Sequence, residues 1–392
     1  MKVLVYTHEF PPFLGGLATT SYKLAKGFSD SGLNTLVLAP GYGAGDKEVD
    51  ESLPLRVFRI PSLGRRWVKL IPFLKTVLGW LYLTSTVRRE KPDIVLFITE
   101  EAETVGGLMP FFPFKPVVRV AGSGITTAFY GKKLGKKIMR YPMLRLYDRS
   151  NLIIAVSENT KELIQSIGVD GDKIRVIYNG VEDRMLSEPE SPERLGLLRE
   201  RLGIAGTDKV IITVARVLPR KGQDTVIRAL PEVISEFPGI QYLVVGEGRY
   251  TDKFKELALE MNVSESVIFT GGVRHEDTLD YYDLSDIFVM PNRYWNNKIE
   301  GLPNSIIEAS ARAKPVVAGK HGGSIEAVRD GVTGLLVDPE SVEDTARALL
   351  SLLRDEKTAH LMGVKGHEKV IESHTEKSMI ESYASAIKDA GR

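Results

Sequence analysis

The chain has 392 residues, which is enough for two domains that each bury a full hydrophobic core. Charged residues make up 26% and hydrophobic residues 43%, an ordinary composition for a soluble protein. The net charge of +1 argues against a protein that coats nucleic acid. There is no cysteine, so disulfides, thiolate nucleophiles and cysteine metal sites are excluded.

Strand-like apolar runs alternate with helix-like runs along the whole chain, which is the pattern of parallel sheets with crossover helices. The first half has predicted strands at 2–6, 35–38, 56–60, 93–98, 117–120, 152–156 and 174–177, and the second half at 210–214, 241–245, 267–270, 287–290, 316–318 and 335–337. Segment 179–203 separates the halves; it is rich in Pro, Glu and Ser and has no strand signal. We therefore predict an α/β protein with two doubly wound domains, at 1–182 and 183–372.

The segment 286–317 predicts an anion-binding site. Its apolar run stops at Pro291 and indicates a buried parallel strand. A polar loop follows and ends in Glu300-Gly301-Leu302-Pro303, after which a helical periodicity begins. A helix opened by proline directs its first N–H groups and the positive end of its dipole toward the loop. Such a helix N-terminus suits a phosphate.

Two acids flank this site. Gly301 and Pro303 break the helical pattern, so we predict Glu300 in the loop and Glu308 in the helix. Phosphate repels a nearby carboxylate, and the two acids are therefore expected to bind hydroxyl groups. A ligand with phosphates in its middle and hydroxyls at both ends is a sugar nucleotide.

Other loops at strand ends carry matching features, and ligands of doubly wound sheets bind outside the carboxyl ends of the strands. Arg216 and Lys221 follow the strand 210–214 and are predicted phosphate ligands. Gly246 and Gly248 follow the next strand, and Val273 with Arg274 follow the third, where backbone groups could line a base pocket. The active site is expected in a cleft between the domains, although a pure binding protein could share this architecture.

In the first half, Gly15 and Gly16 lie between the first strand and a predicted helix. Paired glycines permit close approach of a ligand to the backbone, and the helix N-terminus favours an anion. A mere tight turn explains the pair equally well. The glycines of 41–45 lack the GxGxxG spacing, which makes a nicotinamide dehydrogenase a weak alternative.

Neither a metal site nor a membrane span is predicted. Asp170-Gly171-Asp172 precedes a strand and is more typical of a turn than of a cation site. The six histidines form no HExxH motif. The first ten residues have too short an apolar run for a secretory signal, and the apolar stretch 70–83 falls short of a span.

Basic residues accompany apolar ones in 65–91 and 131–149. Basic amphipathic helices of this kind can lie on an anionic membrane. A solvated charged face above core residues is the simpler interpretation. We therefore expect a cytoplasmic protein, with peripheral contact at the inner face of the membrane as the alternative.

Taken together, these loops resemble the retaining glycosyltransferases of family GT4, which have the GT-B fold of two Rossmann-like domains facing across a cleft. The resemblance covers nearly the whole chain. The resemblance rests on these motifs: Gly15-Gly16, Asn179-Gly180-Val181, Arg216 with Lys221-Gly222, Gly246-Glu247-Gly248, Glu300 to Pro303 with Glu308, Gly322-Gly323 with Glu326, and the run GVTGLLV from Gly331.

The resemblance implies a role for each residue. Arg216 and Lys221 would neutralise the departing diphosphate, Glu300 would contact the transferred sugar, and these three are the catalytic candidates. Glu308 would bind the ribose. Further donor contacts are expected at Gly15, Gly16, Gly246, Gly248, Val273, Arg274, Gly301, Leu302, Pro303 and Asn304. The C-terminal helix, 373–392, is expected to return to the first domain.

The chain departs from the family pattern at two positions. Many members carry a histidine that contacts the transferred sugar where this chain has Ala121, and Ser123 is the candidate substitute. Leu302 replaces the usual phenylalanine.

The expected function is metal-independent, retaining transfer of a sugar from a UDP- or GDP-sugar to a hydroxyl of a saccharide or lipid-linked acceptor. No cofactor beyond the donor and no nucleic-acid partner is expected. A nucleotide-sugar epimerase and a non-catalytic sugar-nucleotide-binding subunit are the alternatives.

Overall fold

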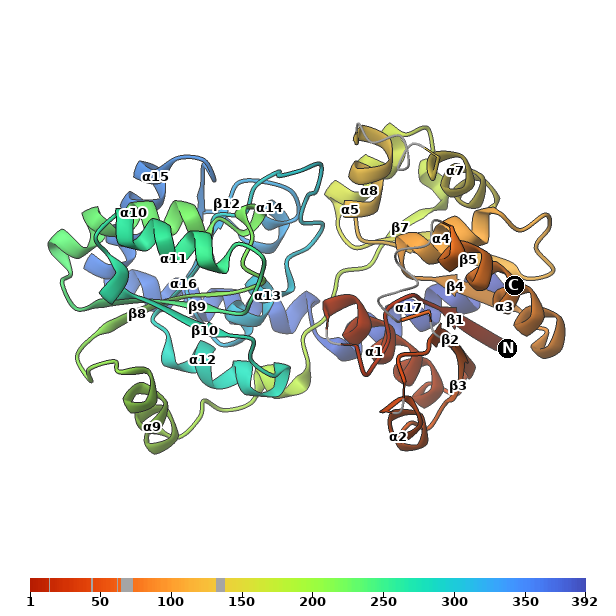
Figure 1. Cartoon of the computed structure of the whole chain (residues 1–392), viewed down its shortest axis with the longest axis horizontal. Helices are drawn as coiled ribbons and strands as arrows, with labels where there is room; N and C mark the ends of the chain where they lie inside the picture. Colours follow the sequence, from red (N-terminus) through yellow and green to blue (C-terminus); the bar gives the residue numbers. More distant parts are fainter. Residues whose placement is uncertain (14, 44, 62, 65–72, 132–137) are drawn as a thin grey trace. The chain divides into compact units, whose positions relative to one another are not determined.

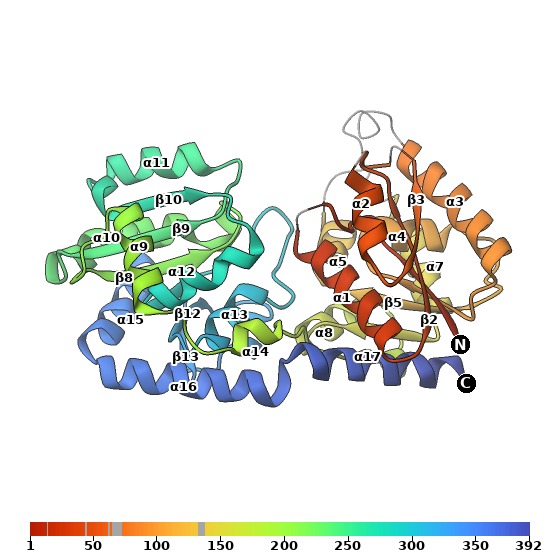
Figure 2. The same cartoon turned by 90° about the horizontal axis from the view of Figure 1, so that it is seen from below.

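The computed structural model describes residues 1–13, 15–43, 45–61, 63–64, 73–131 and 138–392. These residues form two compact units, one of Met1–Tyr178 with Lys377–Arg392 and one of Asn179–Glu376. Each unit contains a parallel β-sheet covered by helices on both faces (Figures 1 and 2).

The sheet of the first unit has the strand order β3-β2-β1-β4-β5-β6-β7, and every described pairing is parallel. The strands are β1 (Lys2–Tyr6), β2 (Asn34–Pro40), β3 (Arg56–Ile60), β4 (Ile94–Phe97), β5 (Lys115–Val120), β6 (Leu152–Ala155) and β7 (Ile174–Val176). Because β1 lies between β2 and β4, the winding direction reverses beside β1. This reversal is the topological switch point of a doubly wound sheet.

Successive side chains of a β-strand point to opposite faces of the sheet, so the core of the first unit has two layers, one on each face. The helices are α1 (Gly16–Asp30), α2 (Gly45–Ser52), α3 (Leu74–Glu90), α4 (Glu100–Gly107), α5 (Ser123–Ile125) with the π-helix Thr126–Tyr130, α7 (Arg140–Arg149), α8 (Glu158–Ser166) and α17 (Glu376–Gly391). Leu4 and Tyr6 pack with residues of α3, α4 and α7. Val3 and Val5 face the opposite layer, where Leu24 of α1 and Tyr383 of α17 lie. The C-terminal helix is therefore part of the first unit's core.

The sheet of the second unit has the order β10-β9-β8-β11-β12-β13 and is also parallel. Its strands are β8 (Lys209–Val214), β9 (Ile240–Val245), β10 (Val267–Gly271), β11 (Ile287–Met290), β12 (Val316–Gly319) and β13 (Gly334–Val337). The winding reverses between β8 and β11, which are hydrogen-bonded neighbours. The loops that follow these two strands therefore lie side by side.

Helices cover both faces of this second sheet. They are α9 (Pro192–Leu202), α10 (Gln223–Glu236), α11 (Thr251–Glu260), α12 (Thr278–Leu284), α13 (Asn304–Ala311), α14 (Ser324–Ala327), α15 (Val342–Arg354) and α16 (Glu356–Ser373). The main core packs α10, α11 and α15 on one face through residues such as Leu230, Phe254 and Leu349. Figure 1 shows α12 on the opposite side of the sheet from α10 and α11.

These observations confirm the predicted α/β class. Each of the thirteen predicted strands is present, with ends that differ from the prediction by no more than two residues. The Asp170 turn is confirmed as well, since Asp170 Oδ1 accepts a hydrogen bond of 3.0 Å from the amide of Asp172 in a 3₁₀ turn. Parts of the two basic segments, 65–72 and 132–137, lie outside the described residues. Within the described ranges, no helix is long and apolar enough to cross a membrane.

Candidate active site

The switch point of the second unit brings the predicted Lys221 and Glu300 together with Arg220, and Arg216 acts on them at longer range. Lys221 Nζ lies 3.0 Å from Glu300 Oε1, and Arg220 Nε lies 3.2 Å from the same oxygen. All three side chains are largely buried, with exposed fractions of 12%, 12% and 9% for Lys221, Glu300 and Arg220. Arg220 Nη1 also donates to the carbonyl of Ile299 at 3.1 Å. The loop after β8 is thereby joined to the loop after β11.

Electrostatics at this cluster favours an added anion. Burial alone would raise the pKa of Glu300, but Lys221, Arg220 and the more distant Arg216 together lower that pKa. Burial lowers the pKa of Lys221, and Arg220 and Arg216 add to this effect against the attraction of Glu300. Three cations therefore share a single carboxylate. A bound diphosphate would supply the missing negative charge.

Glycines make the approach of the two loops possible. Lys221 ends a 3₁₀ turn and is followed by Gly222 with φ of 78°, a conformation that favours glycine. A Cβ on Gly222 would lie 2.2 Å from the carbonyl oxygen of Pro291. Any larger residue would push the loop after β8 away from the loop after β11.

The Gly322-Gly323 pair packs against the loop after β11. A Cβ on Gly323 would lie 1.7 Å from the carbonyl oxygen of Gly301, and the amide of Gly323 donates to the carbonyl of Glu300 at 3.0 Å. Gly322 has φ of 57°. The helix that follows the pair, α14, has only four residues. The observed contacts of the pair are with the Glu300-Gly301 backbone.

The helix after the loop begins where the sequence predicts. Pro303 is the N-cap of α13, so Glu300 lies in the loop and Glu308 within the helix. Tyr282 donates a hydrogen bond of 2.8 Å to Glu308 Oε2. Asn304 Oδ1 accepts one of 2.8 Å from the side-chain Nδ2 of Asn179, which ties the start of α13 to the start of the unit. Leu302 is buried, so it contributes to packing.

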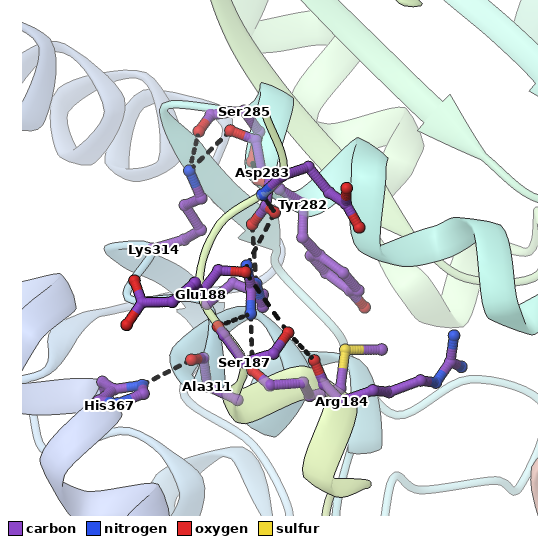
Figure 3. Close-up of polar contacts among 12 residues, drawn as sticks. Arg184, Ser187, Glu188, Tyr282, Asp283, Ser285, Ala311, Lys314 and His367 are labelled. Carbon is purple, nitrogen blue, oxygen red and sulfur yellow. Dashed lines mark hydrogen bonds and ion pairs between the residues drawn. The ribbon is translucent and has the colours of Figure 1, made fainter. Parts of the chain in front are cut away.

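A buried ion pair holds the other end of α13. Arg312 Nε and Nη2 donate to the two oxygens of Asp283 at 2.7 and 2.8 Å, and the Arg312 and Asp283 side chains are 2% and 3% exposed. Arg312 also donates to the carbonyl of Ser187 at 2.6 Å. Figure 3 shows the surrounding contacts, with Lys314 directed at the carbonyls of Asp283 and Ser285.

The same view includes the contact of His367 with the carbonyl of Ala311, at 2.6 Å from its Nδ1. His367 belongs to α16, which packs along α13. The C-terminal end of α13 is therefore held by contacts with segment 179–203, α12 and α16, and the loop that leads into its N-terminus carries Glu300.

The residues after β9 and β10 that are predicted to contact the donor have different surroundings. Cβ atoms on Gly246 and Gly248 would each lie 2.3 Å from a carbonyl oxygen of the loop after β8, so both glycines are required by packing between neighbouring loops. Val273 is half-buried and Arg274 exposed. The Arg274 guanidinium pairs with Asp277, at 2.8 Å from Nε, and with Glu276. These ion pairs involve only the side chain of Arg274, whereas the predicted base pocket uses the backbone of Arg274.

In the first unit, Gly15 is the N-cap of α1 and Gly16 its first residue. Among the described residues, no heavy atom lies within 4 Å of a Cβ placed on Gly16. This glycine is therefore not required by packing against the described part of the chain. The neighbouring Leu14 is outside the described residues.

The surroundings of Ala121 form a small cavity of about 20 Å³ lined by Glu100, Glu103, Ser123 and Tyr147, among others. Ser123 Oγ donates to Glu100 Oε1 at 3.3 Å. Tyr147 donates to Glu103 Oε2 at 2.5 Å, and burial raises the pKa of Glu103 to about 8. The predicted substitute for the family histidine thus contacts a carboxylate.

Sequence reasoning missed Arg220 and Tyr282. Arg220 lies between the two predicted cations in the run ARVLPRK, and that proximity was the available signal. Tyr282 comes from α12, and nothing in the sequence links it to Glu308. Within the described ranges, no cluster of histidine and acidic residues has the arrangement of a metal site.

Two doubly wound units, with buried cations at a strand-end switch point beside a helix N-terminus, define a class of two-domain enzymes that bind phosphorylated ligands. Family models agree: "Glycosyltransferase Family 4" matches residues 14–184 and "Glycosyl transferases group 1" matches residues 197–369. The chain belongs to this glycosyltransferase family, and it is a glycosyltransferase of the GT-B fold.

Named relatives cover almost the whole chain. It is 31% identical over 381 residues to the GDP-mannose-dependent alpha-(1-6)-phosphatidylinositol monomannoside mannosyltransferase of Mycobacterium tuberculosis, covering 94% of this chain and 93% of the relative. It is 25% identical over 397 residues to the alpha-monoglucosyldiacylglycerol synthase of Streptococcus pneumoniae, covering 99% and 86%.

Solved structures share the fold. HepE of Anabaena, in complex with UDP-glucose, superposes with a TM-score of 0.81 at 22% identity over 99% of this chain and 100% of that one. Sucrose-phosphate synthase of Thermosynechococcus elongatus has a TM-score of 0.84 at 19% identity, covering 99% and 98%.

Proposed function

We propose that this glycosyltransferase moves a hexose from a nucleotide diphosphate sugar to a hydroxyl of a glycolipid or saccharide, with retention at the anomeric carbon. The observation that carries the proposal is the buried cluster of Arg220, Lys221 and Glu300, with Arg216 nearby. Its surplus of positive charge lies at the N-terminus of α13, where a diphosphate would be stabilised.

The proposed chemistry uses this surplus. Negative charge builds on the diphosphate as the glycosidic bond breaks, and fixed cations stabilise that charge without reorganisation. Lys221 and Arg216 are assigned to the diphosphate, and Arg220 holds Glu300 in place. Glu300 is assigned to hydroxyls of the transferred sugar and Glu308 to those of the ribose.

The remaining donor contacts follow from these assignments. Gly15, Gly16 and the backbone of Gly301 to Asn304 would approach the phosphates, and the backbone of Val273 and Arg274 would approach the base. The acceptor hydroxyl attacks on the face from which the diphosphate leaves, and a departing phosphate oxygen accepts the hydroxyl proton.

GDP-mannose is the first donor to test, because the relatives of M. tuberculosis and Mycolicibacterium smegmatis named as GDP-mannose-dependent are both 31% identical to this chain. A melting-shift screen of GDP-mannose, UDP-glucose and their nucleotides tests the proposal, since a ligand that binds only the folded state raises the melting temperature. We expect a GDP-mannose shift that Lys221→Ala reduces. If no nucleotide sugar shifts the melting temperature, the proposal is wrong.

An epimerase is separated from a transferase by product analysis with donor alone. The transferase releases nucleotide diphosphate when acceptor is added, whereas an epimerase converts the donor without acceptor. A binding subunit takes up nucleotide sugar but releases no nucleotide diphosphate with any acceptor.

We also propose peripheral contact with an anionic membrane through the basic segments 65–91 and 131–149, to which α3 and α7 belong. Phe73, Val77 and Leu81 are spaced four residues apart and are 66%, 51% and 49% exposed. Arg88 and Arg89 continue the helix on its exposed side. An apolar stripe beside basic residues is the pattern of an interfacial helix.

Flotation with vesicles that contain phosphatidylglycerol tests this contact. The protein is expected to float with anionic vesicles at low salt and to remain below with neutral ones. Val77→Ser with Leu81→Ser should reduce flotation and leave nucleotide binding intact. Equal flotation of this variant and the wild type would exclude α3 as the contact.

A further inference from the structure

A basic and aromatic pocket lies at the strand ends of the second unit, outside the predicted donor contacts. It has a volume of about 460 Å³ and is lined by Arg249, Tyr250, Lys253, Trp295 and Asn296. The first three residues follow β9 or begin α11, and the last two belong to the loop after β11. Neighbouring strand-end loops therefore build the pocket together.

The aromatic rings and cations of the pocket are in mutual contact. The rings of Tyr250 and Trp295 are edge to face, with centroids 5.6 Å apart and planes at 88°. The Arg249 guanidinium lies 5.4 Å from the Tyr250 centroid and 5.3 Å from that of Trp295, and Lys253 Nζ lies 5.4 Å from the Tyr250 centroid. Neither Arg249 nor Lys253 forms an ion pair in the part of the chain that the structure describes. Both positive charges are therefore available to an anion.

A tight hairpin holds Trp295 in place. Asn296 and Asn297 have φ of 52° and 57°, which is the conformation of a type I′ turn. The amides and carbonyls of Trp295 and Lys298 exchange hydrogen bonds of 3.1 and 3.0 Å. The pocket wall is therefore preorganised, which reduces the entropy lost on binding.

The base of this hairpin is joined to the cation cluster. Arg293 pairs with Asp224 of α10 at 2.5 Å, and its amide donates to the carbonyl of Arg220 at 3.0 Å. Glu300 follows the hairpin by two residues. The pocket thus lies at the outer end of the loop that carries the proposed sugar contact.

We propose that this pocket binds an anionic sugar unit of the acceptor, one that bears a phosphate or a carboxylate. Aromatic rings stack on the apolar face of a pyranose, and exposed cations beside them bind its charged group. An uncharged sugar would leave both cations unpaired. The assignment to the acceptor rests on the proposed function, whereas the binding chemistry rests on the pocket alone.

Saturation-transfer NMR with mannose 6-phosphate tests the proposal, with mannose and inorganic phosphate as separate probes. Saturating GDP and UDP are added so that the probe does not occupy the donor site. Mannose 6-phosphate is expected to bind more tightly than either control. Trp295→Ala and Arg249→Gln are each expected to weaken its binding about tenfold.

Control variants test whether binding of mannose 6-phosphate is specific to this pocket or arises from positive surface charge in general. Lys255→Gln removes an exposed cation of the same helix outside the pocket, and should leave binding unchanged. Trp295→Phe keeps an aromatic ring and should retain most of the binding, which controls for misfolding of Trp295→Ala. Binding of mannose 6-phosphate that is absent, no tighter than that of phosphate, or equally reduced by Lys255→Gln would overturn the inference.

Separate binding measurements distinguish failure of the pocket proposal from failure of the proposed transferase function. Melting shifts by nucleotides report the donor site, and they should be the same in the pocket variants and the wild type. Nucleotide binding without sugar-phosphate binding would reject the pocket alone. Sugar-phosphate binding without any nucleotide shift would reject the transferase assignment and retain the pocket.

Discussion

Lys221 Nζ lies 3.0 Å from Glu300 Oε1 in a buried site, although the two residues are far apart in the sequence. Arg220 contacts the same carboxylate oxygen, so the ion pair is surrounded by additional positive charge. The adjacency of β8 and β11 creates this contact.

Lys221→Ala is expected to lower the turnover number by about 10² to 10³, the loss found when one preorganised charge donor is removed. The fold should survive, because Glu300 keeps Arg220 at 3.2 Å. Initial-rate kinetics and thermal unfolding measure both effects. Arg228→Ala, which removes an exposed cation of α10, is the matched control. Near-normal turnover in Lys221→Ala would refute the role of Lys221.

Glu308→Ala is expected to weaken the binding of free nucleotide about 10- to 100-fold, since hydrogen bonds to a charged group contribute about 1.5–3 kcal/mol. Tyr282→Phe removes the 2.8 Å hydrogen bond to Glu308 but keeps the carboxylate, so its loss should be smaller. Calorimetric titration measures the nucleotide affinity of both variants. An unchanged affinity in Glu308→Ala rejects the ribose assignment.

Gly16→Ala tests whether a ligand approaches the start of α1. Because the described residues leave space for the added methyl group, thermal stability should change little. Activity should nevertheless fall if donor phosphates contact the Gly16 backbone. Gly206→Ala, at an exposed glycine with equal space, should leave both quantities unchanged. Full activity in Gly16→Ala would remove this glycine from the donor site.

Glu103 is expected to make stability depend on pH. Burial raises its folded-state pKa from 4.5 to about 8, so the folded state binds a proton that the unfolded state has lost between these values. The contribution of Glu103 is therefore fully present below pH 4.5 and is lost as the pH rises through 8. The loss is a few kcal/mol at about 1.4 kcal/mol per pKa unit.

Urea unfolding between pH 5 and pH 8 measures this contribution. The wild type should lose stability over this range relative to Glu103→Gln, which stays neutral throughout. Glu162→Gln, at an exposed position of α8 and not among the charges that shift the Glu103 pKa, should follow the wild type. Parallel curves for the wild type and Glu103→Gln would contradict the raised pKa.

Arg312→Ala is expected to lower the free energy of unfolding by about 3–5 kcal/mol, because it leaves the buried Asp283 carboxylate uncompensated. Arg354→Ala breaks the solvent-exposed pair with Glu236 and should lower the free energy of unfolding far less, because solvent screens exposed charges. Denaturant unfolding compares the two. Similar losses in both variants would show that burial of the Arg312 pair has no special effect.

The class of fold and the elements that carry the site could be predicted from the amino-acid sequence. Buried parallel strands are continuous apolar runs, and their signal survives without tertiary information. The break between Glu300 and Glu308 was also predictable, because Gly301 and Pro303 act locally on the backbone. The positions of Arg216 and Lys221 after β8 followed from the same local reasoning.

Which of these side chains are in contact depends on the folded arrangement of the strands. Strand order is set by packing of helices on both faces of a sheet, so the neighbouring positions of β8 and β11 are not readable from either strand alone. Arg220, Tyr282 and the Arg312 pair take their roles from this arrangement. The packing roles of Gly246, Gly248 and Gly323 likewise depend on carbonyl groups of distant loops, because steric exclusion acts through space rather than along the chain.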